Sequence, residues 1–392
     1  DMLREISSKQ GLKASSLLDL YRDREGNLWM ASDGNGVIKM KGTDVQLVTG
    51  FFADTTSYIS AMLQAADTFW FFNATANMVH RVYHNKITSF SLGKNRMRVD
   101  YMYISNKHLY LCSAREMICI RDKDERSAYL RPRFVLKSDV HFLTIGYGIK
   151  DPNGCIILSL QRDLNSYVSV LKNDTIIMEY PLAIISDQMT IDHKGNLWIV
   201  SRDNHVMVFS LRKDQPAQYL QLLHDYQKGL PVTSPRSIAL DQLGNVWVGT
   251  RYHGVFQFRN KNDKLIQVAQ YTTHNGLTDN FAYFLHCGDS NTIWVGTQTG
   301  LDKIFLKKGK FIIGNVSKNN NFFQSIRRVF TDNDHSVWAL TGEGSVIKIA
   351  GSAYFPTPPA PALLLSSVLV NNKTYDGPLD KFSHDQNNFT FS

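Results

Sequence analysis

The sequence predicts an all-β protein in which one hairpin unit recurs along the chain. The clearest copy is Asp241–Gln257. Its Asp/Gly/Asn-rich turn precedes Val246–Thr250, a stretch of β-branched and aromatic residues suited to a buried strand. Gly254 then allows a second reversal of the chain. Similar units centre on Trp29, Trp198, Trp294 and Trp338.

One large residue per unit recurs at a regular spacing of 40 to 49 residues. A period in the forties, with about four short strands per unit, predicts a β-propeller. We expect each of these wedge residues to be buried between neighbouring blades. Eight repeats can be counted. Seven blades are the alternative, if one weak repeat merges with its neighbour or the first unit belongs to a preceding propeller. The eight wedge positions are Trp29, Trp70, Tyr110, Ile157, Trp198, Trp247, Trp294 and Trp338.

The two ends of the chain predict how the ring closes. The last repeat offers only three strands, and the Pro-rich stretch Phe355–Pro361 that follows cannot join a central ladder. Met2–Ile6 has no partner strands of its own, so we expect it to supply the fourth strand of the last blade. We assign residues 1–355 to the propeller. Residues 356–392 are predicted to be a linker and the first strands of a truncated β-sandwich.

Composition restricts the classes of protein to be considered. Of the 392 residues, 43% are hydrophobic and 20% are charged, as in folded globular proteins. No apolar run is long enough to span a bilayer and no signal-peptide pattern is visible, so we expect membrane contact only through segments absent from this chain. The net charge of +8 favours an anionic partner, but the basic residues are scattered. Nucleic acid is not expected as a partner.

Motifs that would indicate an enzyme are missing from the sequence. It has no nucleophile elbow, no zinc-protease motif and no phosphate-binding glycine loop, so we expect neither catalytic residues nor a cofactor or metal. The four cysteines form no CxxC pair. Cys112 and Cys119 flank a predicted turn, where either a disulfide or two buried thiols would fit.

Ligand-binding candidates come from the loops that follow the Trp strands and from those that enter each new blade. Propeller ligands usually gather at such loops around the central channel. Arginine suits a carboxylate or sulfate group, while an aromatic ring can stack on the face of a sugar. The Arg251-Tyr252-His253 triplet is the strongest candidate. The full set is Arg251, Tyr252, His253, Arg202, His205, Arg236, Asn280 and Phe281.

The repeat resembles that of the two-component regulator propeller family. Those repeats combine Gly-Leu, an apolar strand, D-x-x-G-x-[LVI]-W-[IV]-G-T and a second Gly-Leu/Val. Gly229–Val255 follows this pattern closely, and so does Asn275–Leu301 in its Gly-Leu and W-V-G-T segments. The tail from Pro361 to Ser392 is similar to the start of the triple-tyrosine β-sandwich that follows such propellers.

The resemblance implies the periplasmic sensor domain of a Bacteroides-type hybrid two-component histidine kinase. Such sensors bind oligosaccharides released from polysaccharides, and fuller members resemble two consecutive seven-bladed propellers. We therefore expect a non-enzymatic domain that binds an oligosaccharide, perhaps an acidic one, and forms a homodimer through the domain that follows. A propeller scaffold for protein–protein interaction is the alternative, and a carbohydrate hydrolase or lyase is a third hypothesis.

Overall fold

The computed structural model describes residues 16–22, 28–33, 36–40, 45–47, 58–66, 68–83, 86–93, 99–105, 108–113, 116–121, 133–137, 143–162, 164–227, 234–320, 323–350, 368–375 and 389–391. The chain divides into two compact units, Asp1–Pro356 and Thr357–Ser392. Regular structure in the described part is almost entirely antiparallel β-strand. Within it, no helix has the length and apolar character needed to cross a bilayer.

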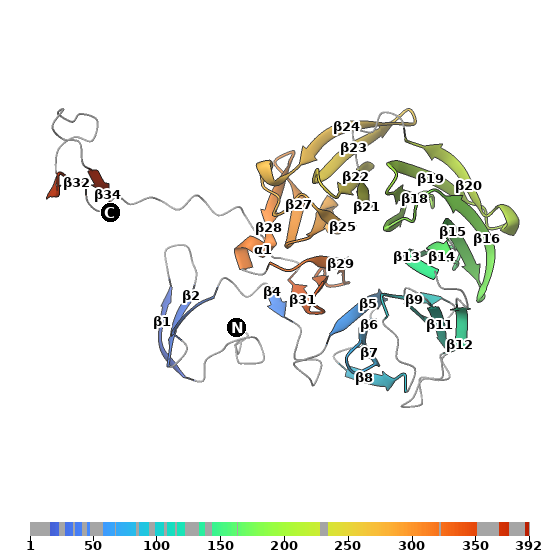
Figure 1. The fold of residues 1–392 in the computed structure, drawn as a ribbon, viewed down its shortest axis with the longest axis horizontal. Helices are drawn as coiled ribbons and strands as arrows, with labels where there is room; N and C mark the ends of the chain where they lie inside the picture. The colour runs from blue at the N-terminus through green and yellow to red at the C-terminus, as the bar shows by residue number, and fades with distance from the viewer. Residues whose placement is uncertain are drawn as a thin grey trace. The chain divides into compact units, whose positions relative to one another are not determined.

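Seven four-stranded antiparallel sheets form the blades of a β-propeller, which confirms the predicted fold class (Figure 1). The first strands of neighbouring blades contact one another along the inside of the ring. Blades 1 to 3 contain β5 (Ile59–Ala65), β6 (Thr68–Asn73), β7 (Met78–Tyr83) and β8 (Lys86–Ser91); β9 (Tyr101–Ser105), β10 (His108–Cys112), β11 (Glu116–Arg121) and β12 (Arg133–Lys137); and β13 (Leu143–Lys150), β14 (Ile156–Arg162), β15 (Asn165–Lys172) and β16 (Thr175–Leu182).

The other four blades carry the stronger copies of the repeat. Short helices connect some of their strands: η3 (Pro216–Gln218), η4 (Thr273–Asn275), η5 (Asp289–Asn291) and α1 (Val316–Asn320). Blades 4 to 7 contain β17 (Gln188–Ile191), β18 (Leu197–Ser201), β19 (His205–Leu211) and β20 (Leu220–Asp225); β21 (Pro235–Leu240), β22 (Asn245–Thr250), β23 (Val255–Lys261) and β24 (Lys264–Tyr271); β25 (Ala282–Cys287), β26 (Ile293–Thr297), β27 (Leu301–Lys307) and β28 (Lys310–Asn315); and β29 (Ile326–Thr331), β30 (Val337–Thr341), β31 (Val346–Ile349) and β4 (Val45–Leu47).

Blade 7 is completed by a strand from the N-terminal part of the chain, as expected, but that strand is β4. Leu47 pairs with Ile347 and Val45 with Ile349, so β4 covers the outer edge of β31. That edge is therefore not available to Met2–Ile6, the strand that the sequence had suggested, which lies outside the described residues. At the inner side of the ring, β30 of blade 7 contacts β5 of blade 1.

The repeat that carries Trp29 is not one of the seven blades. Its strands β1 (Leu17–Arg22), β2 (Leu28–Ser32) and β3 (Gly36–Met40) form a separate three-stranded sheet. Among the described residues no fourth strand joins this sheet, because β4, the next strand, completes blade 7. The described strands thus form seven four-stranded blades, which is the alternative that treats the first unit as separate from this ring.

Seven of the eight predicted wedge positions lie between neighbouring blades; the prediction was wrong for Trp29, whose strands form the separate sheet. The seven wedges of the blades are at most 6% exposed. Each belongs to a different hydrophobic cluster, and each cluster joins one blade to the next. Trp247, for example, packs with Leu285 and Ile293 of blade 6, and Trp338 packs with Phe71 of blade 1. These interfaces account for the residue type at the wedge position, because a large apolar side chain removes most area from water.

The acidic residue of the repeat has a structural task. In blade 5, Asp241 accepts the indole N–H of Trp247 at 2.9 Å and the backbone N–H of Asn245 at 2.8 Å. Asp192 and Asp332 hold Trp198 and Trp338 in the same way, at 3.0 and 2.7 Å. The spacing of six residues between Asp and Trp thus follows from one side chain that closes the turn and orients the wedge.

Two smaller predictions concern the cysteines and the tail. Cys112 and Cys119 are buried free thiols, since Cys112 pairs with Met117 and Cys119 with Tyr110.

In the second unit, β32 (Val368–Val370), β33 (Lys373–Thr374) and β34 (Phe389–Phe391) form a three-stranded sheet. Its assignment to a β-sandwich stays a prediction.

Candidate functional site

The predicted ligand residues lie at one end of blades 4, 5 and 6. Pro235 at the start of β21 pairs with Thr250 at the end of β22, so the loop after Thr250 and the connection into β21 lie at the same end of the blade. Ala282 and Thr297 show the same arrangement in blade 6. This end of the ring is called the channel mouth below, because the first strands that line the channel begin there.

At the channel mouth, a carboxylate links two of the predicted arginines. The Nε of Arg202 donates to Oδ2 of Asp187 at 2.7 Å, and a second N–H of Arg202 donates to Oδ1. The Nη1 of Arg236 donates to Oδ2 of Asp187 at 2.8 Å. Two guanidinium groups thus share one carboxylate, and the trio carries a net positive charge. The Nε of Arg236 is buried and has no hydrogen-bond partner among the described residues.

Aromatic rings continue this cluster toward blade 6. The guanidinium carbons of Arg251 and Arg236 lie 5.6 and 6.0 Å from the ring centre of Phe281. Phe281 stacks on Tyr283 with ring centres 4.0 Å apart. Tyr252, whose ring lies 5.3 Å from Arg251, is 57% exposed, and Tyr283 is 41% exposed. The cluster therefore presents cationic groups and accessible aromatic faces side by side.

The other three predicted residues shape or support the surrounding loops. His205 interacts through Nδ1 with Asp225 at 2.8 Å. Asn280 accepts the backbone N–H of Thr273 through its side chain at 2.9 Å, and its carbonyl oxygen accepts the N–H of Gly254, also at 2.9 Å. The carbonyl oxygen of His253 accepts Gln270 Nε2 at 2.9 Å. The structure thus connects Arg202, Arg236, Arg251, Tyr252 and Phe281, while His205, His253 and Asn280 have partners of their own.

Below the mouth, Arg328 crosses the space enclosed by the first strands. Its guanidinium carbon lies 4.3 Å from the ring of Tyr101, 4.7 Å from that of Tyr147 and 5.3 Å from that of Phe284. These rings come from blades 2, 3 and 6, so the cation is held by aromatic faces from across the ring. In the part of the chain that the structure describes, Arg328 forms no ion pair with a carboxylate.

The mouth cluster and Arg328 are close enough to interact electrostatically. Burial raises the pKa of Tyr101, Arg328 opposes this, and the carboxylates of Asp100 and Asp187 reinforce it. Asp187, which holds Arg202 and Arg236, therefore acts on the same phenol as Arg328. The charge of Arg328 and the charges at the channel mouth therefore influence each other.

Strand register explains which side chains reach the channel. The first strand of each of the seven blades has one equivalent position. The residue there pairs with the second-strand residue that comes two places after the wedge. In sequence the seven positions precede the wedge by nine or ten residues, a spacing that would have identified Arg328 and its aromatic neighbours. These positions are Ala61, Tyr101, Tyr147, Gln188, Ser237, Phe284 and Arg328.

One residue before this position, several first strands carry a β-bulge. Arg236, Tyr283 and Arg327 are the extra residues of β21, β25 and β29. A bulge leaves its extra residue outside the regular ladder and redirects the side chain. This places Arg236 and Tyr283 at the channel mouth, and it adds Arg327, an exposed arginine that the loop-based prediction missed.

The described residues offer little that resembles a catalytic or metal site. Within them, no group of three His, Cys, Asp or Glu side chains could hold a metal ion. His286 is the one histidine there with a large pKa shift: burial lowers its pKa to about 4, and its Nε2 lies 2.9 Å from the Thr331 hydroxyl. It packs between blades 6 and 7, away from the arginine cluster.

No protein-family model matches the sequence, and no curated protein matches it either. The similarities are to solved structures. The extracellular domain of the putative hybrid two-component system BT3049 from B. thetaiotaomicron has a TM-score of 0.67 and 14% identity, covering 99% of this chain and 51% of that one. The corresponding domain of BT4673 has a TM-score of 0.57 and 16% identity, covering 91% and 49%. The chain thus spans about half the length of these extracellular domains.

An enzyme has a related fold. Virginiamycin B lyase from Staphylococcus aureus, in a catalytically inactive form with quinupristin, has a TM-score of 0.59 and 12% identity, covering 78% of this chain and 98% of the lyase. At these identities the similarities concern the fold alone. They agree with a propeller-like fold and leave the activity to be argued from the site.

Proposed function

We propose that this chain is an extracytoplasmic, periplasmic sensor domain of a two-component system that binds an acidic oligosaccharide at the channel mouth. Binding is transmitted to a histidine kinase through segments outside this chain, and the domain dimerises through the region that follows the propeller. The domain itself is not an enzyme. The fold that this ring shares with sensor domains of hybrid two-component systems supports this role.

The observation that carries the proposal is the excess of arginine around the channel. Arg202, Arg236, Arg251, Arg327 and Arg328 come from the first strands and adjoining loops. Only Asp187 forms ion pairs with any of them in the described part of the chain. Guanidinium groups bind carboxylate and sulfate through paired hydrogen bonds, so an anionic ligand would satisfy donors that the protein leaves open.

The aromatic rings point to a sugar rather than to a small inorganic anion. Tyr252 and Tyr283 are exposed beside the arginines, and Phe281 stacks on Tyr283 and lies 6.0 Å from Arg236. Apolar ring faces bury the C–H faces of pyranose rings, while the adjacent cations bind acidic substituents. Because the cluster extends over blades 4 to 7, it suits a ligand of more than one sugar unit.

The test is calorimetric titration of uronic-acid and sulfated disaccharides, with neutral disaccharides of the same linkage as controls. Arg236→Gln and Arg328→Met should each weaken binding about tenfold or more, since a hydrogen bond to a charged group contributes about 1.5–3 kcal/mol. Arg259→Gln removes an exposed arginine at the opposite end of blade 5 and should have no effect. Equal binding of neutral and acidic sugars, or full affinity in both arginine variants, would contradict the proposal.

The related fold of the lyase makes an enzyme the second candidate. Chromatography of the same titration mixtures distinguishes the two. A sensor returns the sugar unchanged, whereas a hydrolase or lyase yields shorter or unsaturated products. A chain that binds no sugar but retains a protein partner in a pull-down would instead favour the scaffold alternative.

A further inference from the structure

The hairpins that connect the third and fourth strands of blades 5 and 6 end in lysines. Both hairpins lie at the end of the blades opposite the channel mouth, because β23 and β27 begin at the mouth and run away from it. The last ladder pair is Lys261 with Lys264 in blade 5, and Lys307 with Lys310 in blade 6. Lys308 lies in the turn of the second hairpin. These five exposed side chains, called the lysine tips below, are Lys261, Lys264, Lys307, Lys308 and Lys310.

The two lysine pairs lower the stability of their hairpins, since like charges directly opposite each other on neighbouring strands repel. In blade 1 the same ladder position holds Tyr83 and Lys86. In blade 3 it holds Lys172 and Thr175, so a pair of lysines is not part of the repeat. Lys308 has a φ of 50°, a left-handed conformation for which such turns favour Asn or Gly. An anionic partner would offset the repulsion.

Four of the lysine tips form no ion pair with a carboxylate in the described part of the chain: Lys261, Lys264, Lys308 and Lys310. The acidic residues at this end of blades 5 and 6 have other partners. Asp241 accepts hydrogen bonds within its own turn, and Asp289 lies 2.6 Å from Nδ1 of His335.

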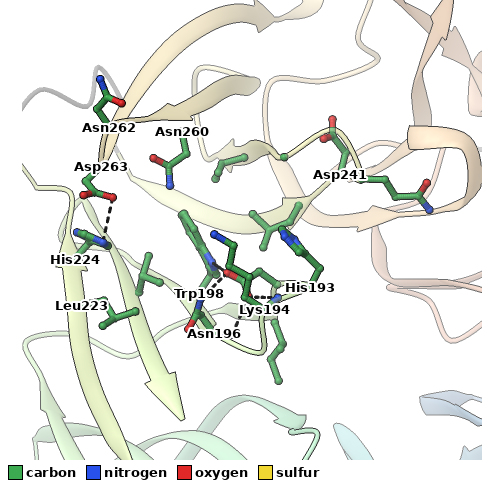
Figure 2. Close-up of a pocket in the computed structure, with 17 residues that line it drawn as sticks. His193, Lys194, Asn196, Trp198, Leu223, His224, Asp241, Asn260, Asn262 and Asp263 are labelled. Carbon is green, nitrogen blue, oxygen red and sulfur yellow. Dashed lines mark hydrogen bonds and ion pairs between the residues drawn. The ribbon is translucent and has the colours of Figure 1, made fainter.

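Asp263 is next to Lys264 in sequence, but its carboxylate is engaged on the other side of the hairpin. Figure 2 shows it directed at His224 of blade 4, 3.5 Å away, on the wall of a cavity of about 700 Å³ beside Trp198. Leu265 belongs to the same hydrophobic cluster as Trp198, so it faces blade 4. Lys264 therefore faces blade 6, because successive side chains of a strand alternate. The carboxylate and this lysine thus lie on opposite sides of the hairpin.

Two exposed aliphatic side chains lie on the facing sides of blades 5 and 6, next to the lysine tips. Ile266 follows Lys264 by two residues on the same face of β24 and is 50% exposed. Leu306 pairs with Phe311, which packs against Trp247 of blade 5, so Leu306 faces blade 5; it is 43% exposed. Cations beside aliphatic groups suit the headgroup region of an anionic bilayer.

We propose that the lysine tips, together with Ile266 and Leu306, bind the surface of an anionic phospholipid bilayer. An ammonium group is a point charge that attracts lipid phosphates in any orientation, whereas the arginines of the channel mouth suit paired hydrogen bonds to one anion. Lipid phosphates relieve the repulsion within the two lysine pairs, and the two aliphatic side chains contact the headgroup boundary. This surface is separate from the channel mouth and does not depend on the function proposed there.

The test is co-sedimentation of the full chain with lipid vesicles at about 0.1 M NaCl. Vesicles of equimolar phosphatidylcholine and phosphatidylglycerol should retain the protein, and vesicles of phosphatidylcholine alone should not. Raising NaCl to about 0.5 M should release it, because salt screens attraction to a charged surface. Equal binding to both lipids, or none to either, would overturn the proposal. Retention on polygalacturonate without binding to vesicles would also overturn it, in favour of a soluble polyanion.

Variants identify the lysine tips as the binding surface. Lys264→Gln/Lys310→Gln removes one lysine from each pair and should weaken vesicle binding about twentyfold, since each basic residue near an anionic surface contributes about fivefold. It should not lower the urea midpoint of unfolding, because it relieves both repulsions. Lys86→Gln/Lys172→Gln makes the same change at the same ladder position of blades 1 and 3 and should weaken binding less than about threefold. Unchanged binding in the first variant, or an equal loss in the second, would contradict the proposal.

Discussion

Blades 5 and 3 supply hydrogen-bond donors to the buried carboxylate of the repeat turn in different ways. In blade 5, Asp241 accepts the indole N–H of Trp247, so carboxylate and wedge belong to one hairpin. In blade 3 the equivalent carboxylate is that of Asp151, and the wedge is Ile157, whose side chain has no N–H group to donate. There the hydroxyl of Tyr219, from the segment between β19 and β20 of blade 4, donates to Asp151, and Asn153 donates to the same hydroxyl at 2.9 Å.

The difference shows how a weakened repeat remains part of the ring. A buried carboxylate needs hydrogen-bond donors, whichever part of the chain provides them. Where the wedge carries an N–H, the turn is satisfied locally. Where it does not, the neighbouring blade supplies the donor, and a local interaction becomes one between blades. Blade 2 shows a related solution, since the hydroxyl of its wedge Tyr110 donates to Asp174 of blade 3 at 2.6 Å.

The largest expected effect comes from the wedges themselves. Trp247→Ala should lower the free energy of unfolding by about 5 kcal/mol, because it leaves a large cavity and also removes a donor from Asp241. Ile157→Ala should cost about 3 kcal/mol, since a smaller side chain is lost and the donor of Asp151 remains. Urea denaturation of both variants measures the difference. Equal losses would mean that the local hydrogen bond adds nothing to the wedge.

An intermediate, pH-dependent effect should identify the locally satisfied carboxylates. Burial alone would raise the pKa of Asp192, but hydrogen bonds from Trp198, Asn196 and Lys194 outweigh it and lower the pKa below 3.8. The stabilisation is therefore present above the ordinary pKa and disappears as the pH falls through the lower folded value.

Asp192→Asn should thus be about 2 kcal/mol less stable than wild type at pH 7, because an amide N–H₂ replaces one accepting oxygen. The deficit should shrink as the pH falls from about 4 through the lower folded pKa of Asp192, because the wild-type carboxylate then becomes protonated as well. Denaturation curves between pH 7 and 2.5 test this, with the exposed Asp214→Asn as control. A deficit that stays constant over this range would rule out the carboxylate as its source.

The smallest effect tests the bond between blades 3 and 4. Tyr219→Phe removes the hydroxyl that Asp151 and Asn153 share and should cost about 1–2 kcal/mol. The matched control is Tyr103→Phe, since the buried hydroxyl of Tyr103 has no hydrogen-bond partner among the described residues. That change should stay within about 0.5 kcal/mol. Similar losses of unfolding free energy in the two variants would mean that the hydrogen bond from Tyr219 to Asp151 does not stabilise the contact between blades 3 and 4.

Much of the fold was predictable because the repeat is a local pattern. The turn, the wedge and their spacing lie within one hairpin, so Trp247 and its counterparts could be placed between blades before any coordinates were known. Loop position likewise indicated Arg202, Arg236, Arg251 and Phe281 at one end of the ring. Arg328 was missed because the prediction considered only loops, whereas Arg328 lies on the first strand of blade 7. Its contacts with Tyr101, Tyr147 and Phe284 join three other blades.

The sequence by itself determined an all-β ring of repeated hairpins and the identity of its wedges, since both follow from periodicity and local turn chemistry. Tertiary structure alone decided the number of blades, because the assignment of β4 to blade 7 depends on which strand edge is open when the ring closes. It also decided the aromatic enclosure of Arg328 and the cavity beside Trp198. Both arise from side chains that are distant in sequence and become neighbours only through the circular arrangement.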